Sequence, residues 1–206
     1  MACRAAGRQA EGGPRAVKVG FYCYNEGPHF DIAKHLISSV RRTMPGVEVW
    51  HLTGADCPKH PDADDVRRVA GLPMAVTRIA HHAELEGDWL YIDTDCVLMR
   101  DVRHIFDDNF SIAVTDRVGS PWEHSEYGRA MPYNMGVTFS RGPMFWQLVL
   151  NGLRALPPKL QEWEGDQRVV CELIRMGYPA RVLPGNVYNF TPVNRGDSIE
   201  HAAICH

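Results

Sequence analysis

The chain has 206 residues, of which 45% are hydrophobic and 23% charged, and its formal net charge is −3 at pH 7. This is the composition of an ordinary globular domain that is large enough to bury a core. The small negative charge gives no electrostatic reason to expect nucleic-acid binding, which normally requires a basic surface. No apolar run approaches the length needed to cross a bilayer, so no transmembrane segment is expected.

The N-terminal residues and the cysteines indicate the setting of the domain. Residues 1–15 are rich in Gly, Ala and Arg without the apolar stretch of a secretory signal, so we expect a disordered tail before one folded domain at 16–206. None of the six cysteines has C-x-x-C spacing, which argues against a structural zinc site. Cys23, Cys96 and Cys171 lie in apolar runs, which favours buried, reduced thiols in a cytoplasmic protein.

Apolar segments predict strands that alternate with helices. The β-branched and aromatic run at 17–23 predicts the first strand, and an amphipathic helix should follow Pro28 and end before Pro45. Further strands are predicted at 47–52, 89–93, 111–115 and 133–140, and further helices at 73–86, 143–153 and 166–176. Loops are predicted at 53–65 and, as a long functional loop, at 117–131. The alternation predicts a single α/β domain with a mixed, mostly parallel sheet that is flanked by helices.

Two carboxylates end the most apolar of these strands. The segment 89–93 is wholly apolar until Asp93, as expected of a strand covered on both faces, and Asp95 follows two residues later. The period of a strand would point both carboxylates to one side, with Thr94 opposite. Ligands of open α/β sheets bind at the carboxyl ends of strands, where two hard oxygen ligands would hold Mg²⁺ or Mn²⁺ and, through it, a diphosphate. Alone, the pair is equally compatible with a solvated acidic strand end.

Four short segments, in order along the chain, resemble those of a known family. They are Asp93-Thr94-Asp95 after its apolar strand, Asn134-Met135-Gly136, Gly165-Asp166-Gln167 and Ile204-Cys205-His206. The set resembles glycosyltransferases of the A-type fold, and among them the family that contains glycogenin and bacterial lipopolysaccharide galactosyltransferases. The resemblance implies a Rossmann-like nucleotide-diphospho-sugar transferase domain at 16–206. It also implies transfer of a sugar from a nucleotide-sugar donor, expected to be a UDP-sugar, to a glycan, lipid-linked or protein hydroxyl, with retention of configuration.

The same resemblance implies a metal site. Asp95 would be the main ligand of Mn²⁺ or Mg²⁺, and Asp93 would share the metal or contact the donor ribose. His206 would complete the protein ligands, because an imidazole nitrogen is compatible with Mn²⁺; the alternative is a frayed terminal histidine. The family pattern continues past this histidine with a glycine- and lysine-containing segment that contacts the diphosphate. The sequence ends at His206, so we expect another group to cover the phosphates, or weaker donor binding.

Three polar residues would lie at the reacting sugar if the resemblance holds. Asn134 would contact the acceptor or the transferred sugar, although a strand-edge amide bonded to a turn is the alternative. Asp166 would position the sugar or the acceptor, and a helix N-cap role is the alternative or an additional one. Gln167 would lie near the reacting face of the sugar.

Thr94 of the acidic motif and three further residues are expected to contact the donor nucleotide. Arg78, on the helix before the motif, would reach the phosphates, or would be a surface arginine on an amphipathic helix. Tyr24 and Asn25, which follow the first strand, would contact the base, because an aromatic face and an amide suit uracil.

Other histidines and aromatic residues give weaker indications. His81 and His82 lie on a predicted helix without His-Glu-x-x-His spacing, so surface positions are expected for them. Trp122, His124 and Tyr127 in the long loop would stack on an acceptor sugar or fill a small core.

Two other functions are compatible with the sequence. In an Asp-x-Asp phosphohydrolase, Asp93 would attack phosphate and Asp95 would protonate the leaving group, but such enzymes usually carry the motif on their first strand. A non-catalytic nucleotide-sugar-binding domain of the same fold is the second alternative.

Overall fold

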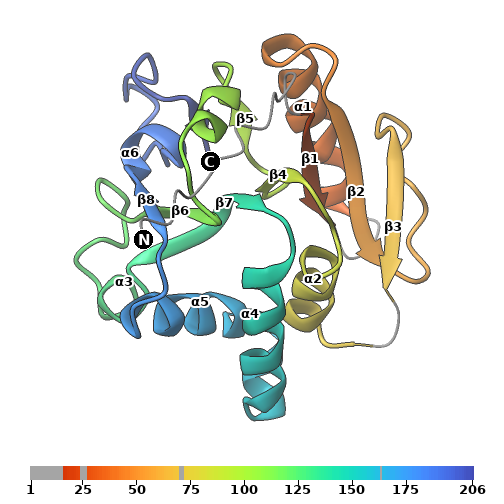
Figure 1. Ribbon diagram of the computed structural model, residues 1–206. Helices are drawn as coiled ribbons and strands as arrows, with labels where there is room; N and C mark the ends of the chain where they lie inside the picture. The colour runs from red at the N-terminus through yellow and green to blue at the C-terminus, as the bar shows by residue number, and fades with distance from the viewer. Residues whose placement is uncertain (1–15, 24–26, 70–71, 163) are drawn as a thin grey trace, which may run out of the picture.

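Seven strands pair side by side in the order β3-β2-β1-β4-β7-β6-β8 in the computed structural model (Figure 1). The structure describes residues 16–23, 27–69, 72–162 and 164–206. The predicted tail at 1–15 and the predicted base-contacting residues Tyr24 and Asn25 therefore lie outside the described residues.

The main sheet is mixed and mostly parallel, as predicted. Every strand runs in one direction except β7, which pairs antiparallel with both β4 and β6. Its strands are β1 (Val17–Tyr22), β2 (Glu48–Gly54), β3 (Asp65–Val69), β4 (Asp88–Ile92), β6 (Ile112–Asp116), β7 (Tyr133–Arg141) and β8 (Arg181–Leu183). A separate antiparallel pair joins β5 (Val97–Leu98) to β9 (Ile204–Cys205).

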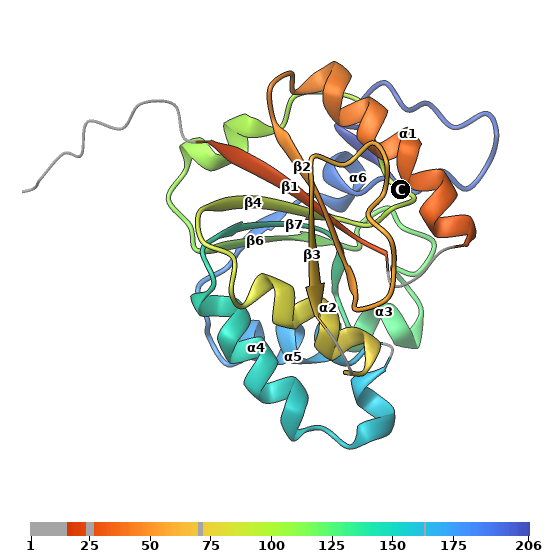
Figure 2. The ribbon, with the colours of Figure 1, turned by 90° about the vertical axis from the view of Figure 1, so that its right-hand side faces the viewer.

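Helices cover both faces of the sheet (Figure 2). On one face lie α1 (Pro28–Thr43) and α6 (Gly185–Tyr188), and on the other lie α2 (Met74–His82), α4 (Met144–Ala155) and α5 (Gly165–Arg175). The remaining helical segments are α3 (Glu126–Ala130) and the 3₁₀ turns Arg103–Asp107 and Pro158–Gln161. The described helices include none that is both long and apolar enough to cross a membrane.

The core follows from the alternation of side chains along the strands. In β4, Leu90 and Ile92 pack on the α1 side, whereas Trp89 and Tyr91 pack on the side of α2 and α4. All five residues of β4 are buried, so both faces of this strand are covered, as its apolar sequence predicted. The strand that ends at the acidic motif is thus anchored on two sides.

Several predicted boundaries were wrong. The predicted loop at 53–65 overlaps the end of β2 and the start of β3, an edge strand whose polar sequence at 65–69 lacks the apolar run expected of a central strand. The predicted helix at 73–86 is limited to Met74–His82, and the predicted loop at 117–131 contains α3.

The surface positions expected for His81 and His82 were also wrong, because other elements pack over that face of α2. His81 places Nε2 3.0 Å from the carbonyl oxygen of Thr53 on β2. His82 stacks on Tyr91 of β4, with ring centroids 3.6 Å apart, and packs edge-on against Trp146 of α4. The buried positions expected for Cys23, Cys96 and Cys171 are confirmed.

Two buried histidines are held neutral. The Nε2 atom of His51 lies 3.2 Å from the carbonyl oxygen of Cys23, and its Nδ1 accepts a hydrogen bond from the backbone N–H of His60 at 3.2 Å. Burial lowers the pKa of His51 to about 4, and burial likewise lowers the pKa of His81 to about 4. Both rings would have to leave these sites or accept an unfavourable buried charge to become protonated.

We therefore expect the free energy of unfolding to fall as the pH drops from 6.5, the ordinary pKa of histidine, towards 4. In that window the unfolded chain binds protons that the folded chain does not, at a cost of up to about 1.4 kcal/mol per pH unit for each histidine. Urea denaturation at several pH values in this window measures the free energy of unfolding. Its dependence on pH should be shallower for His51→Gln than for wild type, with His35→Gln on the exposed side of α1 as the matched control. The same pH dependence in wild type and His51→Gln would show that His51 is not held neutral by burial.

Candidate functional site

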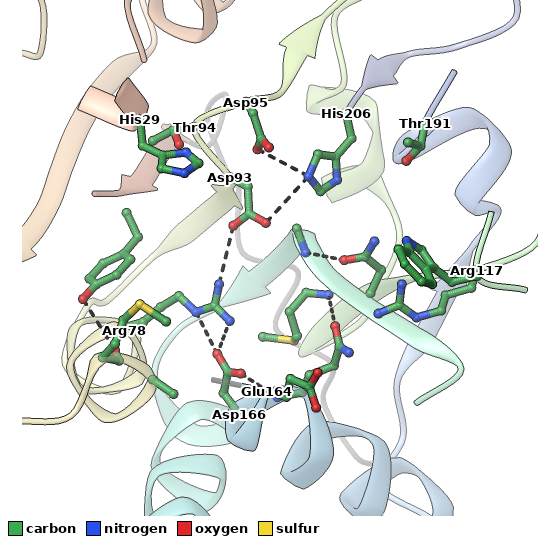
Figure 3. Close-up of a pocket in the computed structure, with 18 of the residues that line it drawn as sticks. His29, Arg78, Asp93, Thr94, Asp95, Arg117, Glu164, Asp166, Thr191 and His206 are labelled. Carbon is green, nitrogen blue, oxygen red and sulfur yellow. Dashed lines mark hydrogen bonds and ion pairs between the residues drawn. The ribbon is translucent and has the colours of Figure 1, made fainter. Parts of the chain in front are cut away.

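A cavity of about 960 Å³ lies at the carboxyl end of β4, where ligands of open α/β sheets bind (Figure 3). Its volume is at the upper end of the range of about 300–1,000 Å³ that is usual for small-molecule sites. The structure brings to this cavity every described residue that the sequence predicted for the site: Arg78, Asp93, Thr94, Asp95, Asn134, Asp166, Gln167 and His206.

The acidic motif lies in a turn rather than within the strand. β4 ends at Ile92, and the backbone N–H of Cys96 donates to the carbonyl oxygen of Asp93 at 3.2 Å. Because the backbone turns here, the strand period does not apply, and the expectation that Thr94 points away is wrong: Thr94 also lines the cavity. The two carboxylates nevertheless converge, because the turn brings both Asp93 and Asp95 towards His206.

His206 faces the two carboxylates through one ring nitrogen. Its Nε2 lies 3.3 Å from Oδ1 of Asp95 and 4.0 Å from Oδ2 of Asp93. Its Nδ1 lies 2.8 Å from Oδ1 of the buried Asn189, so this amide sets the orientation of the ring. The backbone N–H of His206 donates to the carbonyl oxygen of Phe190 at 2.7 Å, which ties the residue to its neighbours.

The charges of this cluster are strongly coupled. Burial raises the pKa of Asp93, although the nearby charges of Arg78 and His206 oppose that shift. The hydrogen bond with His206 lowers the pKa of Asp95. Burial lowers the pKa of His206, but the hydrogen bond with Asp95 and the charges of both aspartates outweigh burial and raise it. The site is therefore an acidic pair partly neutralised by one imidazole and one guanidinium.

Gly136 on β7 leaves the space in which this cluster assembles. A Cβ at this position would lie 2.7 Å from Cε1 of His206 and 3.0 Å from Oδ2 of Asp93, closer than side chains tolerate. The carbonyl oxygen of Gly136 accepts the backbone N–H of Asp93 at 2.8 Å, so the glycine also positions the motif. Two carboxylates and an imidazole around such a space fit Mn²⁺ or Mg²⁺.

The thiol of Cys96 is a weaker candidate ligand. Its sulfur lies within 4.8 Å of ligand atoms of Asp95 and His206. Burial, however, raises the pKa of this thiol well above its ordinary value, and only a thiolate binds metal strongly. Hard cations also prefer oxygen ligands. Asp93, whose Oδ2 lies 4.0 Å from Nε2 of His206, is therefore a better candidate than Cys96 for the third metal ligand.

Arg78 joins the acidic motif to the start of α5. Its Nε donates to Oδ2 of Asp166 at 2.7 Å, its Nη2 donates to the same oxygen, and its Nη1 lies 3.5 Å from Oδ1 of Asp93. Asp166 is fully buried, and its Oδ1 also accepts the backbone N–H of Gln167 at 2.7 Å. The N-cap of α5 is Glu164, so Asp166 does not cap the helix, and Arg78 is not a surface arginine.

The two amides of the predicted site hold β7 in place. Oδ1 of Asn134 accepts the backbone N–H of Gly136 at 2.8 Å. Oε1 of Gln167 accepts the backbone N–H of Met135 at 3.3 Å, and Nε2 donates to the hydroxyl of Tyr127 at 3.0 Å. Both side chains therefore fix the strand next to Gly136 and also line the cavity.

Sequence reasoning missed several residues of the site. The amide of Asn189 orients His206, but no motif marks it. Arg117 was known only as the start of a loop; it is buried, donates through Nε to the carbonyl oxygen of Met131 at 2.8 Å, and lies over the ring of Tyr127. Glu164 lines the cavity with a positive φ of 68°, which its sequence context does not reveal.

The close contacts of Gly136 predict the effect of adding one methyl group. Gly136→Ala should weaken Mn²⁺ binding by tenfold or more, on the order of 1.4 kcal/mol, because Asp93 and His206 must move apart. Isothermal titration with Mn²⁺ measures this, with Gly196→Ala, where a Cβ meets no atom within 4 Å, as the matched control. Equal Mn²⁺ affinity in the Gly136 variant and wild type would show that the cluster is not the metal site.

The buried ion pair predicts a large loss of stability when one partner is removed. Arg78→Met leaves Asp166 charged, buried and unpaired, so the free energy of unfolding should fall by about 3–5 kcal/mol, and the double variant Arg78→Met, Asp166→Leu should recover most of it. Chemical denaturation measures both. Arg103→Met breaks the exposed pair with Asp101 and should cost less than about 1 kcal/mol. A loss that the double variant does not recover would contradict this pairing.

Comparison with known proteins places the fold. No protein-family model and no curated protein sequence matches the chain. Among solved structures, a galactosyltransferase LgtC complex with donor and acceptor sugar analogs matches with a TM-score of 0.61 at 11% identity, over 92% of this chain and 86% of LgtC. Two structures of the glycosyltransferase GlyE from Streptococcus pneumoniae TIGR4, one of them the apo form, match with TM-scores of 0.62 at 15% and 14% identity. They cover 94% and 93% of this chain but 54% of GlyE, so the chain spans about half of GlyE. The chain therefore has the Rossmann-like fold of these glycosyltransferases, as the resemblance in its sequence predicted.

Proposed function

We propose that the chain is a metal-dependent glycosyltransferase that moves a sugar from a UDP-sugar to a hydroxyl acceptor. The observation that supports this best is the convergence of Asp93, Asp95 and His206 around the space left by Gly136. That cluster lies at the carboxyl end of β4, in a fold shared with LgtC and GlyE. The residues that the sequence resemblance assigned to donor and metal line one cavity.

Asp93, Asp95 and His206 would hold Mn²⁺ or Mg²⁺. When bound, the cation would bind the donor diphosphate and neutralise the negative charge that develops on the leaving nucleoside diphosphate. Asn189 keeps the ring of His206 turned towards the carboxylates, and Arg78 keeps Asp93 in place. Contact of Tyr24 and Asn25 with the uracil base stays a prediction.

The sequence resemblance implies retention, and the state of Asp166 favours a front-face displacement over a covalent intermediate at this carboxylate. Both of its carboxylate oxygens accept hydrogen bonds, and the side chain is fully buried, so it does not present a free oxygen to the sugar. The side-chain amide of Gln167 likewise already makes hydrogen bonds to Met135 and Tyr127. In this mechanism the departing diphosphate accepts the proton of the acceptor hydroxyl, and the protein contributes positioning and electrostatic stabilisation.

The phosphohydrolase alternative receives less support. Such an enzyme usually grips the phosphate with a lysine, and no lysine lines the cavity within the described residues. Arg78, the cationic group beside Asp93, is already paired with the buried Asp166. The motif also follows the fourth strand along the chain rather than the first. Assays for UDP release from UDP-sugars and for phosphate release from a phosphomonoester separate the two activities.

Asp95→Asn should abolish sugar transfer, by about a hundredfold or more, because a neutral amide replaces the ionised ligand of the cation. The fold should persist, since Asp95 is the most exposed member of the cluster. UDP release and the UDP-sugar shift in melting temperature, each with and without Mn²⁺, measure the effect, with the exposed Asp62→Asn as control.

Near-normal transfer by Asp95→Asn would refute the site assignment. Donor binding by wild type without any hydrolysis or transfer would instead favour the non-catalytic binding domain.

A further inference from the structure

Trp122 presents a large apolar surface to the cavity. Trp122 is one of the residues that line the cavity, and it is 55% exposed. The indole packs edge-on against Tyr127, with ring centroids 6.1 Å apart, and Tyr127 lies under the guanidinium of Arg117 at 4.9 Å. Arg117 is itself buried, so Trp122 rests on a packed support. An aromatic residue placed in this way gains burial only when a ligand covers it.

The backbone of Trp122 is fixed rather than loose. Its carbonyl oxygen accepts hydrogen bonds from the backbone N–H of Ser125 at 3.0 Å and from the Ser125 hydroxyl at 2.7 Å. A Cβ on Gly128 would lie 2.0 Å from this carbonyl oxygen, so the first turn of α3 packs on Trp122 only because residue 128 is glycine. The backbone that carries the exposed indole is therefore fixed beside the cavity.

Glu164 supplies a carboxylate to the same cavity. Among the described residues it is the one non-glycine residue with a positive φ, at 68°. Glycine would adopt this conformation without strain, so the glutamate side chain is present at a cost to the backbone. Figure 3 shows Glu164 next to Asp166, on the side of the cavity away from Asp95 and His206. This carboxylate is thus separate from the proposed metal site. Its charge acts on Arg117, which supports Tyr127 and, through it, Trp122, so Glu164 and Trp122 belong to the same part of the cavity.

We propose that this part of the cavity is an acceptor subsite for a sugar ring, which stacks on Trp122 and donates hydroxyl hydrogen bonds to Glu164. A pyranose has a face of C–H groups that packs on an indole and a rim of hydroxyls that a carboxylate accepts. The inference rests on the proposed function, because it names the acceptor class of that enzyme. It selects a carbohydrate over a protein or lipid hydroxyl.

Binding of sugars in the absence of donor and metal tests the subsite directly. The probes are maltose, cellobiose and lactose, with a serine- and tyrosine-containing peptide for comparison, and saturation-transfer NMR detects their contact with the protein. At least one disaccharide should bind wild type. Trp122→Ala should weaken that binding by about tenfold, as truncation of a buried aromatic contact does, while Trp122→Phe should retain most of it.

Two further variants separate binding from folding. Glu164→Gly removes the carboxylate and relieves the positive φ, so its melting temperature should equal or exceed that of wild type while sugar binding falls. Val118→Ala alters an exposed residue of the same loop that does not line the cavity, and it should bind like wild type. Peptide binding in place of sugar binding, no sugar binding at all, or sugar binding unchanged in Trp122→Ala would each overturn the subsite.

Donor binding measured on the same samples distinguishes this inference from the proposed function. The shift in melting temperature with UDP-sugar and Mn²⁺ should be lost in Asp95→Asn and kept in Trp122→Ala. Sugar binding should show the reverse dependence. If wild type shows no donor shift but binds sugar, and Trp122→Ala loses that binding, the proposed function is refuted and the subsite is supported. If wild type shows a donor shift but binds no sugar, the proposed function is supported and the subsite is refuted.

Discussion

The mutual repulsion of three carboxylates is the constraint on which the site depends, since the charges of Asp95 and Asp166 both act on Asp93. Asp93, Asp95 and Asp166 would repel one another at the end of an apolar strand unless cationic groups lay between them. Arg78 is shared by Asp166 and Asp93, and the ring of His206 lies between Asp93 and Asp95. A divalent cation bound through Nε2 of His206 would take the place of the proton there, because a ligating imidazole is neutral. Arg78 would then leave part of the negative charge of the three carboxylates for the divalent cation to compensate.

The sheet topology makes this arrangement possible. β7 is the antiparallel strand, so its early residues, rather than its end, lie beside the carboxyl end of β4. That pairing places Gly136 against Asp93 and leaves room for His206, which arrives next to β9 from the far end of the chain. The same strand carries Asn134, whose amide supports Gly136. The antiparallel direction of β7 therefore brings the acidic motif together with residues that are remote from it in the sequence.

The features of the fold that depend on local patterns could be predicted from the sequence. The buried strand before Asp93, the amphipathic helix α1 and the mixed, mostly parallel sheet all follow from apolar periodicity. The positions of Asp93 and Asp95 followed from their place after that strand. The turn that brings Thr94 into the cavity did not, because it is set by pairing with β7.

Interactions between distant segments were beyond local patterns. Arg78 and Asp166 are 88 residues apart, and neither sequence context shows that they meet. His81 and His82 looked polar and exposed, but β2, β4 and α4 bury them. Asn189 and the strained Glu164 belong to no sequence motif, because their roles depend on which segments lie beside them in the folded chain.

The most direct test of the central claim is anomalous diffraction at the manganese edge from crystals grown with Mn²⁺ and UDP. A single strong peak within coordination distance of the Asp95 carboxylate and of Nε2 of His206, with the UDP diphosphate beside it, is the result this account predicts. UDP bound in the cavity with no manganese peak at this cluster, or a manganese peak elsewhere on the chain, would contradict it.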